Sequence, residues 1–270
     1  MSGNIRLLAD TLARAGKENR AALIAYLPAG FPTVDGGIAA IQAALYGGAD
    51  VFEVGLPHSD PVLDGPVIQT ADDIALRGGV RIGDVIRTVR EAYRATGKPV
   101  LVMSYWNPIS RYGIERFARE LAEAGGAGCI LPDLPVQESA AWRDRATKLG
   151  LATVFVAAPS STGPRLREIT AAGSGFVYAS SLMGVTGARA ADGEAAPTLV
   201  RRLREVTDLP VCVGTGISNA AQAARVARYA DGVIVGTALV KAVLDAPDEA
   251  AALTAVKTLT AELAEAVRRT

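Results

Sequence analysis

The sequence has few of the side chains on which metal centres and redox sites depend. It contains one histidine, His58, and two cysteines, Cys129 and Cys212, among 270 residues. Because a zinc-type cluster needs several such ligands, we expect no metal site and interpret His58 as a loop residue. Both cysteines lie in apolar runs. This placement indicates small buried side chains in a protein of the reducing cytoplasm.

The sequence also lacks the features of nucleic-acid-binding and membrane proteins. Lys and Arg together number 28, as do Asp and Glu, so no overall field draws the chain to nucleic acid or to a membrane surface. No apolar run reaches transmembrane length, and the stretch 1–20 has no signal-peptide core. Nucleotide-binding GKS, GKT and GxGxxG motifs are missing as well. We therefore expect any ligand to be recognised by a few residues of one site and not by the overall charge of the protein.

What the sequence does contain is a regular alternation of short apolar runs and amphipathic segments. Eight runs predict strands, at residues 22–28, 50–56, 99–105, 128–134, 152–158, 176–181, 210–216 and 232–238. Continuously apolar strands separated by helices indicate a parallel sheet covered by helices. Eight such units favour a closed (β/α)8 TIM barrel, with an open doubly wound sheet as the alternative. We predict an α/β fold with a single barrel domain over residues 1–270 and an additional N-terminal helix over residues 4–16.

A carboxylate stands inside the second predicted strand, "DVFEVGL". Side chains alternate along a strand, so Phe52 and Val54 should face the helix layer while Glu53 faces the barrel interior. Active sites of these barrels lie at the carboxyl ends of the strands. Partial burial there raises the pKa of a carboxyl group toward the range of a general acid or base. The alternative is that Glu53 belongs to a structural hydrogen-bond network.

The segment that follows this strand, "PHSDPVLDGP", is long for a βα connection. Long ordered loops in compact domains tend to be functional, so Asp60 and Asp64 are candidate site residues. Asp before Pro or Gly is also ordinary turn chemistry, and this alternative stays open for Asp60 in particular.

Small residues follow the last three predicted strands, in "SSLMGVTGARAADGEAA", "VGTGISN" and "VGTALVKAV". Gly216 would allow the backbone to approach a ligand closely, and Gly236 with Thr237 opens a short predicted helix. Phosphate sites in TIM barrels lie at the loops after strands seven and eight, next to such a helix. We therefore expect a phosphate monoester, although a structural turn would also explain the glycines.

Several stretches together give the sequence its family resemblance, namely "FEVGLPHSDPVLDGPVIQ", "PDLPVQES", "GVTGA", "GTGIS" and "DGVIVGTALVK". Over essentially its whole length the chain resembles the tryptophan synthase alpha subunit family. The resemblance implies a retro-aldol cleavage of indole-3-glycerol phosphate to indole and glyceraldehyde 3-phosphate, with no metal or organic cofactor in this subunit. It also implies a pyridoxal-phosphate-dependent beta subunit as partner, in an alpha2beta2 heterotetramer.

The resemblance assigns roles to individual residues. It implies that Glu53 is the general acid/base and that Asp64 is the carboxylate that meets the indole nitrogen. The residues that it places around the substrate and its phosphate are Tyr178, Thr186, Gly187, Gly216, Gly236 and Thr237. The sequence departs from the family pattern at His58, where an aromatic residue is common, and at Leu182 and Met183, which replace a more polar pair. The expected partner surface comprises Asp60 and the segments 105–108 and 132–135.

Two other functions remain as alternatives. One is a different phosphate-binding barrel enzyme, such as a sugar-phosphate isomerase or an aldolase. A Schiff-base aldolase needs a lysine inside the barrel, whereas Lys98 precedes a predicted strand and Lys241 lies on a predicted helix. The other alternative is an inactive barrel that serves as a regulatory subunit, which the presence of both Glu53 and Asp64 disfavours.

Overall fold

The computed structural model describes residues 3–180, 194–214 and 216–269, and its strands form one parallel sheet. The sheet order is β5-β4-β3-β2-β1-β9-β8-β7-β6. The strands are β1 (Ala22–Pro28), β2 (Val51–Gly55), β3 (Val100–Met103), β4 (Gly128–Ile130), β5 (Ala152–Val154), β6 (Val156–Ala157), β7 (Val177–Ser180), β8 (Val211–Gly214) and β9 (Gly232–Val235). Each lies within one of the eight predicted runs, so the TIM barrel prediction is confirmed.

The fifth predicted strand differs from expectation because it is divided at Phe155. Its first part, β5, pairs with β4, and its second part, β6, pairs with β7. The two ends of the sheet therefore meet on one continuous stretch of chain, and this exchange of partners closes the barrel. The Phe155 side chain is buried among residues of the outer layer.

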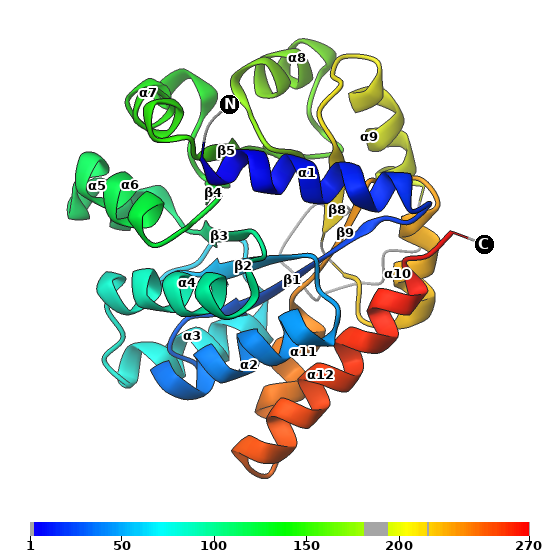
Figure 1. Ribbon diagram of the computed structural model, residues 1–270. Coiled ribbons are helices and arrows are strands. Elements are labelled where there is room, and N and C mark those ends of the chain that lie inside the picture. The colour runs from blue at the N-terminus through cyan, green and yellow to red at the C-terminus, as the bar shows by residue number, and fades with distance from the viewer. Residues whose placement is uncertain (1–2, 181–193, 215, 270) are drawn as a thin grey trace.

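Helices cover the outside of the barrel (Figure 1). They are α2 (Val34–Gly47), α3 (Pro66–Arg77), α4 (Ile82–Thr96), α5 (Trp106–Tyr112), α6 (Ile114–Glu123), α7 (Ala140–Leu149), α8 (Gly163–Ala172), α9 (Ala195–Arg204), α10 (Ala220–Ala227), α11 (Thr237–Leu244) and α12 (Glu249–Ala266), with a 3-10 turn, η1 (Val136–Glu138). Side-chain caps fix several starts; the Thr33 hydroxyl, for example, accepts a hydrogen bond from the Gly36 N–H at 3.0 Å. Among the described helices, none is long and apolar enough to cross a membrane.

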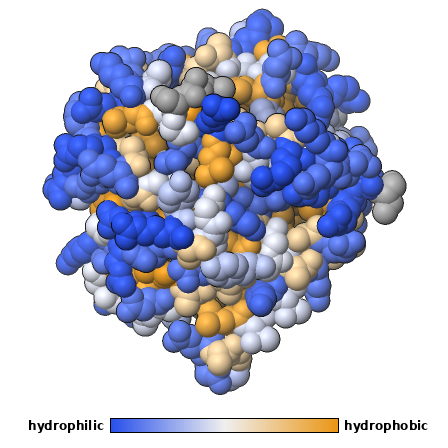
Figure 2. Space-filling model, viewed as in Figure 1, coloured by the Kyte–Doolittle hydropathy of each residue, from blue (hydrophilic) through white to orange (hydrophobic). Residues whose placement is uncertain are grey.

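The predicted N-terminal helix is α1 (Asn4–Lys17), which lies across the barrel in Figure 1. Leu8, Leu12 and Ala15 form one buried cluster with interior strand residues such as Ile24 and Val51. This apolar face closes the amino-terminal end of the barrel. The surface seen from the same side is mainly hydrophilic, with scattered hydrophobic areas (Figure 2).

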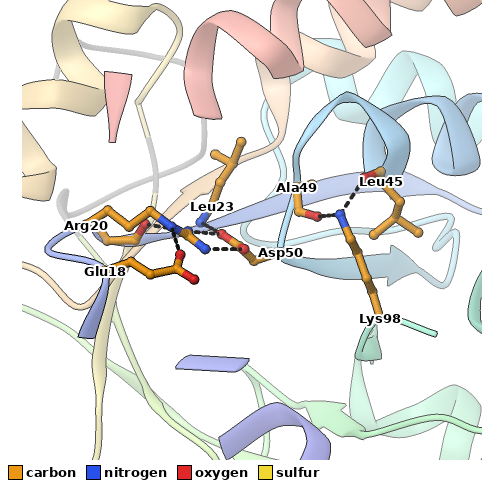
Figure 3. A network of polar contacts seen from close by, with 8 residues as sticks. Glu18, Arg20, Leu23, Leu45, Ala49, Asp50 and Lys98 are labelled. Atoms are coloured by element: carbon orange, nitrogen blue, oxygen red, sulfur yellow. Dashed lines mark hydrogen bonds and ion pairs between the residues drawn. The ribbon is translucent and has the colours of Figure 1, made fainter. Parts of the chain in front are cut away.

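A partly buried polar network ties together the starts of the first strands (Figure 3). The Arg20 guanidinium donates to both carboxylate oxygens of Asp50, at 2.6 and 2.9 Å, and Asp50 also accepts from the Leu23 N–H at 2.9 Å. The Lys98 ammonium donates to the carbonyls of Leu45 and Ala49 at 2.6 and 2.7 Å. The network fixes the starts of β1 and β2, and thus the register that places their other ends at the site.

Candidate active site

Glu53 lies where its position in the strand predicted. In the parallel register of the sheet it is beside Tyr26 of β1 and Leu101 of β3. Its neighbours Phe52 and Val54 pack in the outer layer, whereas Val51 joins the interior cluster. The period of two in β2 therefore turns Glu53 into the barrel, and the prediction of an inward side chain is confirmed.

Burial dominates the electrostatics of Glu53. The residue is 1% exposed, and within the part of the chain that the structure describes neither carboxyl oxygen has a hydrogen-bond partner. Loss of hydration raises the pKa of Glu53 to about 8, since burial disfavours the charged form. The group can therefore exchange a proton near neutral pH, and no described side chain ties it into a structural network.

Asp64 is held by a phenol from the neighbouring strand connection. The Tyr105 O–H donates a hydrogen bond of 2.8 Å to Asp64 Oδ2, and the Tyr105 hydroxyl oxygen accepts one from the Leu63 N–H at 3.0 Å. Burial raises the pKa of Asp64, while the Tyr105 hydrogen bond and the nearby His58 oppose this rise. The hydrogen bond favours the ionised carboxylate and gives it a defined orientation.

One cavity at the carboxyl ends of the strands brings most of the predicted site residues together. Of the predicted residues it is lined by Glu53, Asp64, Tyr178, Gly216, Gly236 and Thr237. Further lining comes from Tyr26, Ile68, Met103, Ile217 and Ile234. The cavity thus has two carboxyl groups, apolar walls that suit an aromatic ring, and a glycine-lined side. Thr186 and Gly187, together with Leu182 and Met183, lie outside the described residues.

The glycine-lined side has the backbone geometry expected of an anion site. Gly216 has a φ of 75°, a left-handed conformation that favours glycine. Gly236 precedes α11 and its carbonyl accepts from the N–H groups of Leu239 and Val240 at 2.9 and 3.1 Å. The first N–H groups of a helix have no acceptors within the helix and carry its positive dipole end, so this end of α11 suits a phosphate.

The other charged and polar candidates lie away from the cavity lining. Asp60 is exposed and accepts from the Ser59 hydroxyl at 2.6 Å. His58 is in the loop between β2 and α3, with its ring 4.8 Å from that of Tyr105. Lys98 belongs to the network at the opposite barrel end, and Lys241 pairs with Asp245 at 2.7 Å, so neither is placed for Schiff-base chemistry.

Sequence reasoning missed three polar residues beside the cavity. Tyr26 occupies an inward position of β1, a signal that alternation along the strand could have given. Tyr105 was considered only as part of a partner surface, although its hydroxyl holds Asp64. Asp72 lies on the buried face of α3 with Ile68 and Ala71, where a carboxyl group is unexpected. Within residues 3–180, 194–214 and 216–269, no group of three or more His, Cys, Asp or Glu side chains could hold a metal ion.

Comparison with known proteins agrees with the resemblance in the sequence. A family model for the tryptophan synthase alpha chain matches residues 12–268. The tryptophan synthase alpha chain of Streptomyces coelicolor is 76% identical over 268 residues, which cover 99% of each chain. That of Streptomyces avermitilis is 77% identical over 263 residues, 97% of this chain and 95% of the relative.

A solved structure of Mycobacterium tuberculosis tryptophan synthase superposes with a TM-score of 0.91 at 48% identity, covering 97% of this chain and 98% of the other. A second structure of that enzyme, in an aminoacrylate- and BRD0059-bound form, gives a TM-score of 0.89 at 45% identity, with 97% and 98% of the two chains covered. The fold, its elements and the sequence agree along the whole length. This chain therefore belongs to the tryptophan synthase alpha chain family.

Proposed function

We propose that Glu53 and Asp64 carry out the reaction of this chain's family, the cleavage of indole-3-glycerol phosphate to indole and glyceraldehyde 3-phosphate. Membership of the family makes the chain a carbon–carbon lyase of tryptophan biosynthesis. The reaction needs a proton at the indole ring carbon and removal of a proton from the glycerol arm hydroxyl. The bond between ring and arm then breaks, its electron pair stays with the ring, and the arm hydroxyl becomes the aldehyde.

Glu53 is the residue to which we assign these proton transfers. Its interior position isolates it from competing partners, and burial raises its pKa to about 8, close to the pH at which it must gain and lose protons. A general acid/base works best when its pKa is near the working pH. The single observation that carries the proposal is a carboxyl group at the carboxyl end of a barrel strand that has no hydrogen-bond partner among the described residues.

We assign to Asp64 the stabilisation of the positive charge that develops on the ring nitrogen. As the ring carbon gains a proton, positive charge appears at the nitrogen, and an ionised carboxylate beside it stabilises the transition state. The hydrogen bond from Tyr105 favours the ionised form of Asp64, against the effect of burial on its pKa, and orients the carboxylate before substrate arrives. Ile68, Met103 and Ile234 supply apolar lining, as an indole ring requires.

The phosphate is assigned to the side of the cavity formed by Gly216, Gly236 and the start of α11. This assignment is supported by the left-handed backbone of Gly216 and by the N-terminus of α11, where helices leave their first N–H groups without acceptors inside the helix. Thr186 and Gly187 are proposed as further substrate contacts from the family resemblance alone. Every step assigned here uses side chains or backbone of this chain, without a metal or an organic cofactor.

A beta subunit that holds pyridoxal phosphate is the partner we propose, in an alpha2beta2 assembly. The expected surface lies on neighbouring loops that contact each other, because the Asp133 carboxylate accepts from the Trp106 N–H at 2.9 and 3.1 Å. Val62, in the loop before Asp64, is a large apolar side chain that is 67% exposed. A partner seated here would cover Val62 and could receive indole, which is apolar and would otherwise diffuse away.

The test of the proposed function is direct product analysis. The purified chain is incubated with indole-3-glycerol phosphate, and indole and glyceraldehyde 3-phosphate are measured in parallel. We expect the two products in equal amounts, with no change when a metal chelator is added. Conversion of a sugar phosphate in place of indole release would instead support the isomerase or aldolase alternative.

A further inference from the structure

Asp72 is a buried carboxyl group for which the proposed reaction has no use. It lies on the second turn of α3, on the face that also buries Ile68, Ala71 and Ala75, and it is 3% exposed. Its Oδ2 accepts from the His58 N–H at 3.5 Å, while its Oδ1 has no hydrogen-bond partner among the described residues. Burying a carboxyl group without full hydrogen bonding is costly, so the position calls for an explanation.

Asp72 and Asp64 line the same small cavity. Its other walls are Tyr26, Leu56, Met103, Ser104, Tyr105 and Pro132. The cavity measures about 10 Å³, at the lower limit for one water molecule. Asp64 also lines the larger cavity that contains Glu53, so it is shared by the two cavities.

A chain of contacts joins the two carboxyl groups. Asp72 accepts a hydrogen bond from the backbone N–H of His58. The centre of the His58 ring lies 4.8 Å from the centre of the Tyr105 ring. The Tyr105 hydroxyl then donates to Asp64 at 2.8 Å. Asp72 thus contacts the loop between β2 and α3 at its start, and Tyr105 contacts the same loop at its end.

We propose that Asp72 is a positioning residue for Asp64, acting through the backbone of His58 and the side chain of Tyr105. The inference rests on the proposed function, because it takes the orientation of Asp64 to matter for turnover. Burial, and then the nearby charge of Asp64, raises the pKa of Asp72 to about 8. This pKa favours a protonated carboxyl group at neutral pH, which can still accept from the His58 N–H through Oδ2.

Asparagine is the conservative replacement for a neutral carboxyl group at position 72, because it has a similar shape and no charge. In Asp72→Asn the amide oxygen still accepts from the His58 N–H, and the amide group cannot ionise. In Asp72→Ala the acceptor is lost and the cavity is enlarged. Because small misplacements of a catalytic group cost up to about 10²-fold, we expect kcat to fall at least ~10-fold in Asp72→Ala and to stay within about twofold of wild type in Asp72→Asn.

The experiment measures kcat for indole release and, separately, the dissociation constant of glycerol phosphate, for wild type, Asp72→Asn, Asp72→Ala and Asp64→Asn. Asp73→Asn is the matched control, because Asp73 is the adjacent residue of α3, and its exposed side chain pairs with Arg77 at 2.9 Å. All assays are run below the unfolding transition of the least stable variant. Binding of glycerol phosphate should be unchanged in the Asp72 variants, since its site lies on the glycine-lined side.

The expected pattern is a loss of kcat in Asp72→Ala, its recovery in Asp72→Asn and unchanged binding in both. Equal kcat values for Asp72→Ala and wild type would overturn the positioning role, as would an equal loss in Asp72→Asn and Asp72→Ala. If Asp64→Asn also turned over normally, the proposed function of Asp64 would itself be wrong. The Asp64→Asn result thus separates failure of the inference from failure of the proposed function.

Discussion

The hydroxyl of Tyr105 lies 2.8 Å from Oδ2 of Asp64 and links the connection after β3 to the loop after β2. The hydrogen bond stabilises the ionised carboxylate and so opposes the rise in the pKa of Asp64 that burial causes. Tyr105→Phe should therefore raise this pKa and move the acid limb of the kcat/KM profile to higher pH. Loss of activity should be greatest at acid pH.

The measurement is the pH dependence of kcat/KM for indole release in wild type and Tyr105→Phe. Tyr112→Phe is the matched control, because it also removes a tyrosine–carboxylate hydrogen bond, the one of 2.7 Å to Glu120, which lies away from the cavity lining. An acid limb that stays in place in Tyr105→Phe would show that Tyr105 does not tune Asp64.

Stability should depend on pH through Glu53. In the unfolded chain its pKa is near the ordinary value of 4.5, whereas burial raises it to about 8 in the folded protein. Between these values the unfolded state has released the proton that the folded state keeps, so the free energy of unfolding falls as pH rises. Glu53→Gln has no such proton. As pH rises from about 4.5 to about 8, its free energy of unfolding should therefore increase relative to that of wild type.

Urea unfolding at about pH 5 and about pH 8 measures the free energy of unfolding of Glu53→Gln minus that of wild type. We expect this difference to grow by at least ~1 kcal/mol between the two pH values. Glu262→Gln, at an exposed site on α12, serves as the control and should show no such trend. A constant difference between Glu53→Gln and wild type would mean that the Glu53 carboxyl group is ionised inside the barrel.

A substitution at Gly236 tests the side of the cavity that we propose for the phosphate. A Cβ at this position would lie 3.1 Å from Cδ1 of Tyr26, tighter than most contacts of this kind, so Gly236→Ala must displace the ring or the backbone beside the site. We expect glycerol phosphate to bind about tenfold more weakly, a change of ~1.4 kcal/mol. Titration calorimetry of Gly236→Ala and of Gly83→Ala, where a Cβ meets nothing within 4 Å, makes the comparison. Equal affinities would place the phosphate elsewhere.

The partner surface is tested at Val62, which is 67% exposed in the loop before Asp64. Val62→Ser removes apolar area that a beta subunit would bury, so stimulation of indole release by that subunit should weaken while the activity of the free chain persists. Ile74→Ser, at a half-exposed position on α3, is the control. Undiminished stimulation of Val62→Ser at limiting partner concentration would remove Val62 from the interface.

Much of the site could be predicted because it follows from the alternation of inward and outward side chains along single strands. Glu53 points inward because Val51 does, and the alternation in β2 is visible in the sequence. The carboxyl ends of parallel strands meet at one end of the barrel, which brings Gly216 and Gly236 to the same cavity. These predictions needed no knowledge of packing between distant segments.

Other features could not be predicted, since they arise from packing between segments far apart in sequence. Tyr105 reaches Asp64 across 41 residues of sequence, and no local pattern specifies that contact. Asp72 follows an apolar helical stripe whose period marks the position as buried but says nothing of its partners. The division of the fifth strand at Phe155 depends on where the barrel closes, which is a property of all strands together.

Turnover by Glu53→Gln tests the central claim most directly. The amide keeps the shape of the side chain but has no proton to exchange, so kcat for indole release should fall by about 10²- to 10⁴-fold. The dissociation constant of glycerol phosphate should stay unchanged, because the substitution leaves the proposed phosphate side of the cavity untouched. Near-normal kcat with unchanged binding would contradict the account and show that Glu53 is not the general acid/base.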